Sequence, residues 1–106
     1  MNTISREELK TKLDRGDPLK LIMVMPEWAD IASHIPGSFA CIEPSEAFAL
    51  LSADDEIIVY CSDPACMNST HAYEVLVSHG YRHLRHYGGG LVDWEAAGYP
   101  VEGESV

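Results

Sequence analysis

Positive charge is scarce in this sequence. Only 7 of its 106 residues are lysine or arginine, against 17 aspartates and glutamates, and the formal net charge is −10 with the histidines neutral. Such a chain repels phosphate backbones and anionic lipid headgroups. We therefore expect neither a nucleic acid nor a membrane among its partners, and a small anionic substrate would meet the same repulsive field.

Long apolar runs and a dense set of cysteines are also absent. No stretch reaches the roughly 18 apolar residues of a membrane span, and no signal peptide is recognisable at the N-terminus. The three cysteines, Cys41, Cys61 and Cys66, are too few and odd in number for the disulfide framework of a small secreted domain. The sequence thus predicts reduced thiols, a cytoplasmic location and, from its length, one domain over residues 1–106.

What is present is an alternation of short apolar runs with helical segments. Ser5 and Glu8 form a capping box that predicts the start of the first helix, and Gly16 predicts its end. Alternating strands and helices predict an α/β fold in which helices cover both faces of a parallel sheet. Strands are expected at residues 19–25, 39–42, 56–60 and 83–87, and further helices at 26–31, from 43, from about 69 to a stop at 80, and at 91–97.

Cys61 directly follows the expected strand 56–60, at the carboxyl end where open α/β sheets hold their ligands. A loop separates it from the next helix, whose free N–H groups and positive dipole end would stabilise a thiolate. Asn68 or Ser69 is the expected N-cap of that helix. A cysteine at the end of a buried strand can equally be a small core residue, as we expect for Cys41. Position alone leaves both interpretations of Cys61 open.

Four segments, in order and at compatible spacing, together resemble the rhodanese-like (sulfurtransferase) domain. This resemblance implies a three-layer α/β/α fold with a central parallel sheet of about five strands. It also implies transfer of sulfane sulfur through a persulfide on Cys61, with no metal or organic cofactor. The donor and the acceptor would be small molecules or protein-bound groups, the acceptor being a thiol or another nucleophile. The matching segments are Ile4-Ser5 with Glu8-Leu9, His34-Ile35-Pro36-Gly37-Ser38, Ile58-Val59-Tyr60-Cys61, and Gly88-Gly89 with Trp94 and Ala97-Gly98-Tyr99-Pro100-Val101.

The resemblance also assigns roles within the loop. Cys61 is the nucleophile, and the residues after it form the cradle of the persulfide, where backbone N–H groups stabilise its charge as an oxyanion hole does. This persulfide loop consists of Ser62, Asp63, Pro64, Ala65, Cys66, Met67, Asn68 and Ser69.

Three departures from the family pattern concern charge and thiols. Where many members have Asp-Val-Arg after the first strand, this chain has Met23-Val24-Met25. The loop is longer than the common one, lacks arginine and lysine, and contains the acidic Asp63. Cys66 adds a second thiol. The missing cations argue against efficient use of thiosulfate, a dianion, and bear less on exchange with a neutral or protein-bound persulfide.

Two residues near Cys61 allow more than one interpretation. Cys66 either resolves a Cys61 persulfide by closing a disulfide or points away and packs with the loop. His71 is either a solvent-exposed helix residue or a substitute for the missing arginine. Cys61, Cys66 and His71 lack a fourth partner at a usual spacing, so no metal is expected.

Two rival functions stay open at this point. One is a non-catalytic rhodanese-like binding or regulatory module. The other is a phosphatase or arsenate reductase on the same scaffold, which the longer loop favours and the missing arginine opposes, because phosphate binds best to a bidentate cation.

Overall fold

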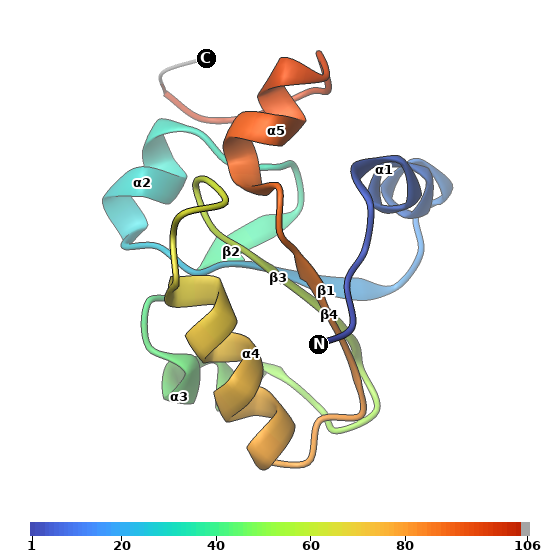
Figure 1. Cartoon of the computed structure of the whole chain (residues 1–106), viewed down its shortest axis with the longest axis vertical. Helices are drawn as coiled ribbons and strands as arrows, with labels where there is room; N and C mark the ends of the chain where they lie inside the picture. The colour runs from blue at the N-terminus through green and yellow to red at the C-terminus, as the bar shows by residue number, and fades with distance from the viewer. Residues whose placement is uncertain (105–106) are drawn as a thin grey trace.

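The computed structural model describes residues 1–104, and four parallel strands form the sheet of this part of the chain. The spatial order is β2-β1-β3-β4, so the third strand of the sequence lies in the interior of the sheet (Figure 1). The register places Tyr60, the last residue of β3, between Met23 of β1 and Tyr87 of β4. The strands are β1 (Leu19–Met23), β2 (Ser38–Ala40), β3 (Glu56–Tyr60) and β4 (His83–Tyr87).

The expected count of about five strands is therefore wrong. The nearest approach to a fifth strand is the segment before the first helix, where Thr3 forms an isolated parallel bridge with His86. Ile4 N–H donates to the carbonyl of His86 at 3.1 Å, and His86 N–H donates to that of Asn2 at 2.8 Å. The chain turns into a helix at Ser5, so this pairing ends before a strand can form.

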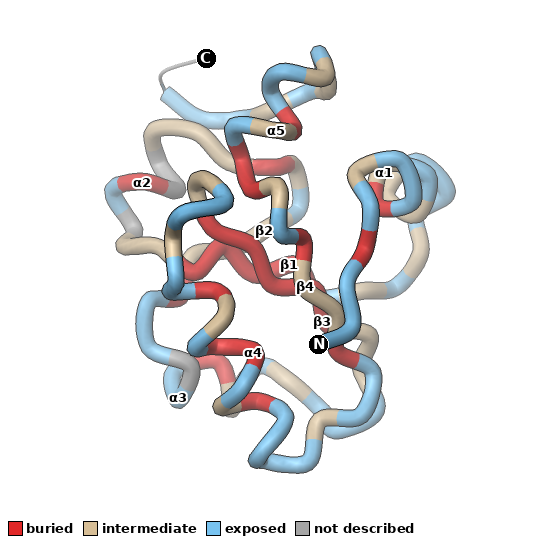
Figure 2. The backbone as a smooth tube through the Cα atoms, viewed as in Figure 1, coloured by how far each residue is buried: buried red, intermediate tan, exposed pale blue. Residues whose placement is uncertain are grey.

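Helices cover both faces of the sheet, which confirms the three-layer arrangement. Ile58 and Tyr60 pack under α1, α2 and α5, whereas Ile57 and Val59 pack over α3 and α4, following the period of two of a strand (Figures 1 and 2). Within residues 1–104 no helix has the length and apolarity needed to cross a bilayer. The helices are α1 (Arg6–Arg15), α2 (Glu27–Ala32), α3 (Pro44–Ala47) with a 3-10 turn η1 (Phe48–Leu50), α4 (Asn68–Ser78) and α5 (Gly90–Ala96).

The first helix begins and ends where the sequence predicts. The Ser5 hydroxyl accepts from the N–H of Glu8 at 3.1 Å, and Gly16 ends α1 in the left-handed conformation at φ 73°. A complete capping box also has the Glu8 carboxylate accepting from the N–H of Ser5, and this part of the prediction is wrong. The Glu8 carboxylate forms an ion pair with Arg85 on β4 instead, with an Nη2–Oε1 distance of 2.9 Å, because the sheet brings a cation within its reach.

Candidate functional site

The loop between β3 and α4 brings two sulfur atoms together. Cys61 is only 1% exposed, and it forms a disulfide with Cys66 across a Cα–Cα distance of 6.2 Å. The expectation of three reduced thiols is therefore not met. A low and odd cysteine count argues against a secreted disulfide scaffold, but it does not reveal a pair that one loop folds together. Cys41 is a free thiol.

The start of α5 anchors this loop. The N–H of Leu91 donates to the carbonyl of Cys61 at 2.9 Å, and the N–H of Val92 donates to the carbonyl of Ser62 at 3.0 Å. Gly90 makes the approach possible. Its φ is +72°, and a Cβ atom there would lie 2.8 Å from the Cys61 carbonyl oxygen and 2.9 Å from the Asp63 nitrogen. The glycine segment after β4 therefore both returns the chain and packs directly on the cysteine loop.

The segment directly after β1 covers the Cys61 sulfur. The thioether sulfur of Met25 lies 3.4 Å from Cys61 Sγ, and the carbonyl oxygen of Val24 lies 3.8 Å from it. The Asn68 side-chain amide donates to the same carbonyl at 3.4 Å. The Cys61 sulfur therefore faces a thioether and a carbonyl. Neither group carries a charge.

Asp63 occupies part of the expected persulfide cradle. Its carboxylate oxygen Oδ1 accepts from the N–H of Ala65 at 2.9 Å and from that of Cys66 at 3.1 Å. The Cys66 N–H also reaches the Asp63 carbonyl at 3.2 Å. Two of the amides that the resemblance assigns to a bound anion are thus bonded within the loop. A carboxylate in this place also repels a further anion.

The prediction of an Asn68 or Ser69 N-cap is wrong. Met67 is the N-cap of α4 and makes no side-chain capping bond. Asn68 is turned toward Val24 as described above. Ser69 is 2% exposed, and its hydroxyl pairs with Nε2 of His86 at 2.7 Å, joining the start of α4 to β4. Burial lowers the pKa of His86, so the ring is neutral near pH 7.

His86 is the residue of this region that sequence reasoning missed. It lies on β4, and 17 positions separate it from Ser69. No local spacing pattern connects the two residues, since they lie on different elements that only the folded sheet brings together. His71, by contrast, is exposed on α4, in agreement with the simpler of its two interpretations.

In the described part of the chain no three histidine, cysteine or acidic side chains are grouped so that they could hold an ion.

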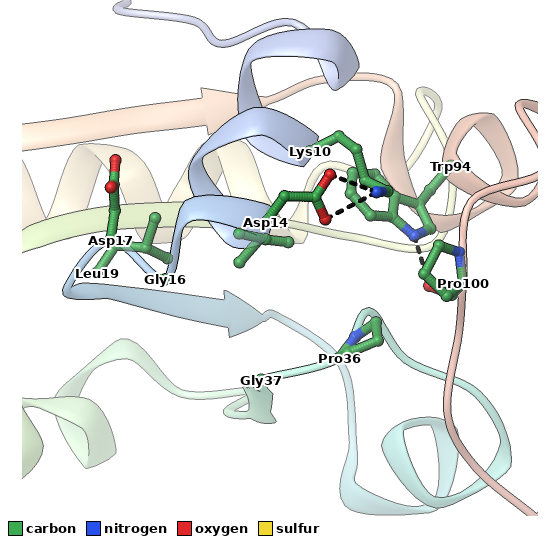
Figure 3. Close-up of a pocket in the computed structure, with 10 residues that line it drawn as sticks. Lys10, Asp14, Gly16, Asp17, Leu19, Pro36, Gly37, Trp94 and Pro100 are labelled. Carbon is green, nitrogen blue, oxygen red and sulfur yellow. Dashed lines mark hydrogen bonds and ion pairs between the residues drawn. The ribbon is translucent and has the colours of Figure 1, made fainter.

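A cavity of about 440 Å³ lies away from the cysteine loop, between α1, the start of β1 and the turn at Pro36 (Figure 3). The Lys10–Asp14 ion pair and Trp94 line it, and no residue of the cysteine loop does. It therefore adds nothing to the chemistry at Cys61.

A family model of the rhodanese-like domain matches residues 5–97. The chain therefore belongs to the rhodanese-like domain family. The match includes the whole cysteine loop and the helix that anchors it.

Individual relatives agree with this membership. The HTH-type transcriptional regulator Rv0324 of Mycobacterium tuberculosis is 29% identical over 103 residues, covering 95% of this chain and 45% of the regulator, so the chain spans less than half of that protein. The rhodanese-like domain of the Alr3790 protein from Anabaena sp. superposes with a TM-score of 0.86 at 25% identity, over 99% of this chain and 81% of that one. The human single-domain sulfurtransferase TSTD1 superposes with a TM-score of 0.75 at 24% identity, over 91% and 96%, and this likeness shows the shared fold.

Proposed function

We propose that this chain is a sulfurtransferase that carries sulfane sulfur as a persulfide on Cys61. The observation that carries the proposal is the position of Cys61. It directly follows β3 at the carboxyl edge of the sheet, and its backbone carbonyl is fixed by α5. Its loop leads into the N-terminus of α4, where N–H groups without helical partners and the helix dipole favour a sulfur anion.

The transfer has two steps. The Cys61 thiolate attacks the outer sulfur of a donor R–S–SH, the S–S bond of the donor breaks, and the donor thiolate leaves with the electron pair. Cys61 then holds the sulfur as Cys–S–SH, whose proton comes from the donor. An acceptor thiolate attacks that outer sulfur, and the Cys61 thiolate is released.

The proposed donor is a neutral persulfide. The Cys61 sulfur contacts the uncharged Met25 thioether, and Asp63 occupies two loop amides. Thiosulfate carries two negative charges and would need a cation at this place, preferably a bidentate guanidinium. A persulfide carries one negative charge at most, and its protonated form presents a soft, uncharged sulfur that suits a thioether contact.

A regulatory role is the second candidate, and one observation favours it. The relative in Mycobacterium tuberculosis is a transcriptional regulator that is more than twice as long as the matched region. A module of this kind could read the state of Cys61 without turnover. The phosphatase alternative has less support, because the loop holds no cation and Asp63 already uses two of its amides.

Intact mass spectrometry tests the proposal. The Cys66→Ala variant, which cannot close the Cys61–Cys66 disulfide, is reduced with dithiothreitol, freed of it, and incubated with cysteine persulfide or with thiosulfate. We expect a gain of one sulfur mass from the persulfide and little gain from thiosulfate. Absence of any gain from either donor would overturn the proposal and favour the regulatory module.

A further inference from the structure

We propose that Cys66 discharges the Cys61 persulfide inside the domain, so that the sulfane sulfur leaves as hydrosulfide and the loop closes to the Cys61–Cys66 disulfide. This activity is that of a sulfane-sulfur reductase that consumes a dithiol. It deepens the proposed function, since it requires the loading of Cys61 described above. It also identifies the thiol that first attacks the persulfide as a side chain of the same loop.

The geometry of the loop favours this reaction. The two cysteines are five positions apart, and their Cα atoms lie 6.2 Å from each other, within the range of ordinary disulfides. Their sulfur atoms are bonded in the structure, so Cys66 can reach the γ-sulfur of Cys61 without rearrangement of the sheet. Attack on this inner sulfur is the reaction that leads directly to the observed bond.

Asp63 fixes the turn that brings Cys66 back to Cys61. Its carboxylate accepts from the N–H groups of Ala65 and Cys66, and its carbonyl also accepts from Cys66 N–H. These bonds fold the loop back toward the Cys61 sulfur. We therefore assign Asp63 as a positioning residue for Cys66. The same bonds explain why an acidic residue stands in a loop that would otherwise cradle an anion.

The atoms and electrons balance in one step. The Cys66 thiolate attacks Cys61 Sγ, and the bond between Sγ and the outer sulfur breaks. The outer sulfur leaves as hydrosulfide and takes the bonding electron pair. The two cysteine thiols are oxidised to the disulfide, and the sulfane sulfur is reduced to the sulfide level. No metal or further oxidant is needed.

An external dithiol must then reopen the loop. Cys61 is 1% exposed beneath Met25, whereas Cys66 is partly exposed, so an incoming thiolate reaches the Cys66 sulfur first. Attack there leaves Cys61 as the departing thiolate, which is the form needed for loading. The second thiol of the reductant resolves the mixed disulfide on Cys66. The reaction sequence therefore places this domain between a source of persulfide and a dithiol reductant.

A single-turnover experiment tests the inference. Wild-type protein and the Cys66→Ala and Cys41→Ala variants are reduced, freed of reductant and given one equivalent of cysteine persulfide. Hydrosulfide release and intact mass are followed together. We expect the wild type and Cys41→Ala to release about one hydrosulfide per chain and to lose the mass of two hydrogens. Cys66→Ala should retain one added sulfur and release hydrosulfide about tenfold more slowly or less, because the intramolecular thiol is gone.

A second variant guards against a trivial loss of folding. Asp63→Ala keeps both thiols and should load normally but release hydrosulfide more slowly, since Cys66 is no longer held toward Cys61. Cys66→Ala that loads and releases hydrosulfide at the wild-type rate would overturn this inference and leave the proposed function intact. Failure of every variant and of the wild type to load sulfur would overturn both.

Discussion

Two cysteines of this domain occupy equivalent places in the sheet and have opposite surroundings. Cys41 follows β2 and Cys61 follows β3, and both parallel strands end at the same edge of the sheet. Both residues are buried, with 6% and 1% exposure. Burial and a place at a strand end therefore do not distinguish the thiol proposed to carry sulfur from the one expected to be inert.

The segment after each cysteine makes the difference. After Cys41 the chain turns at once, and the thiol donates to the carbonyl of Glu43 at 2.9 Å. Burial raises the pKa of the Cys41 thiol, which keeps it protonated. The helix that follows, α3, has four residues, whereas the helix after the Cys61 loop, α4, has eleven. Only the Cys61 site has the N-terminus of a long helix after it, a second thiol and a loop fixed by α5.

Removal of each thiol in turn gives the largest expected effect. Cys61→Ser should abolish the reaction with cysteine persulfide, seen as the change in intact mass and the release of hydrosulfide, because a serine hydroxyl does not form a persulfide. Cys41→Ser should load as the wild type does, at a modest cost in stability of about 1–2 kcal/mol for a polar change in a buried site. Equal loading by Cys61→Ser and the wild type, measured by intact mass, would move the nucleophile elsewhere and break the comparison.

Gly90→Ala tests how far the Cys61 site depends on its anchor. An alanine at φ +72° is strained, and its Cβ would press on the Cys61 carbonyl at 2.8 Å. We expect a loss of about 2–4 kcal/mol in the free energy of unfolding, measured with urea, together with slower sulfur loading. Gly98→Ala is the matched control, since its φ is +78° and no atom lies within 4 Å of the added Cβ. A cost at Gly90 no larger than at Gly98 would show that the loop moves away freely.

Much of the fold around the two cysteines could be predicted from the sequence, whereas several contacts at the Cys61 site could not. Local signals place each strand within a few residues and both ends of α1, because caps, glycine stops and apolar runs act over short distances. The place of Cys61 after a buried strand, together with the family resemblance, indicates it as the nucleophile, and that role stays a prediction. The Met25–Cys61 contact, the Gly90 approach and the Ser69–His86 pair join residues far apart in the chain. Such pairs follow from the packing of whole elements and leave no local pattern.

The strength of thiosulfate binding tests the uncharged surroundings of the Cys61 sulfur. We expect a high KM for thiosulfate, and this KM should rise further at low ionic strength, where the negative charge of the chain is least screened. Met25→Arg should lower the KM for thiosulfate about tenfold, because a charge-assisted hydrogen bond contributes about 1.5–3 kcal/mol. Met25→Leu keeps the bulk without the charge and should not lower it. Tight, salt-independent binding of thiosulfate by the wild type would contradict the argument from missing cations.

The smallest expected effect concerns the Ser69–His86 bond, which ties the helix after Cys61 to β4. Burial lowers the pKa of His86 in the folded state, so the unfolded chain binds a proton more readily than the folded one. The stabilising contribution of the neutral ring is complete above the unfolded pKa of about 6.5 and is lost as the pH falls from there to the lower folded pKa. His86→Gln keeps a group that can donate to the Ser69 hydroxyl but does not titrate. Urea unfolding between about pH 7.5 and 5 should therefore show a smaller fall in stability for this variant than for the wild type. His83→Gln, at an exposed position on the same strand, should keep the wild-type slope. Parallel curves for His86→Gln and the wild type would mean that the ring does not change its protonation on folding.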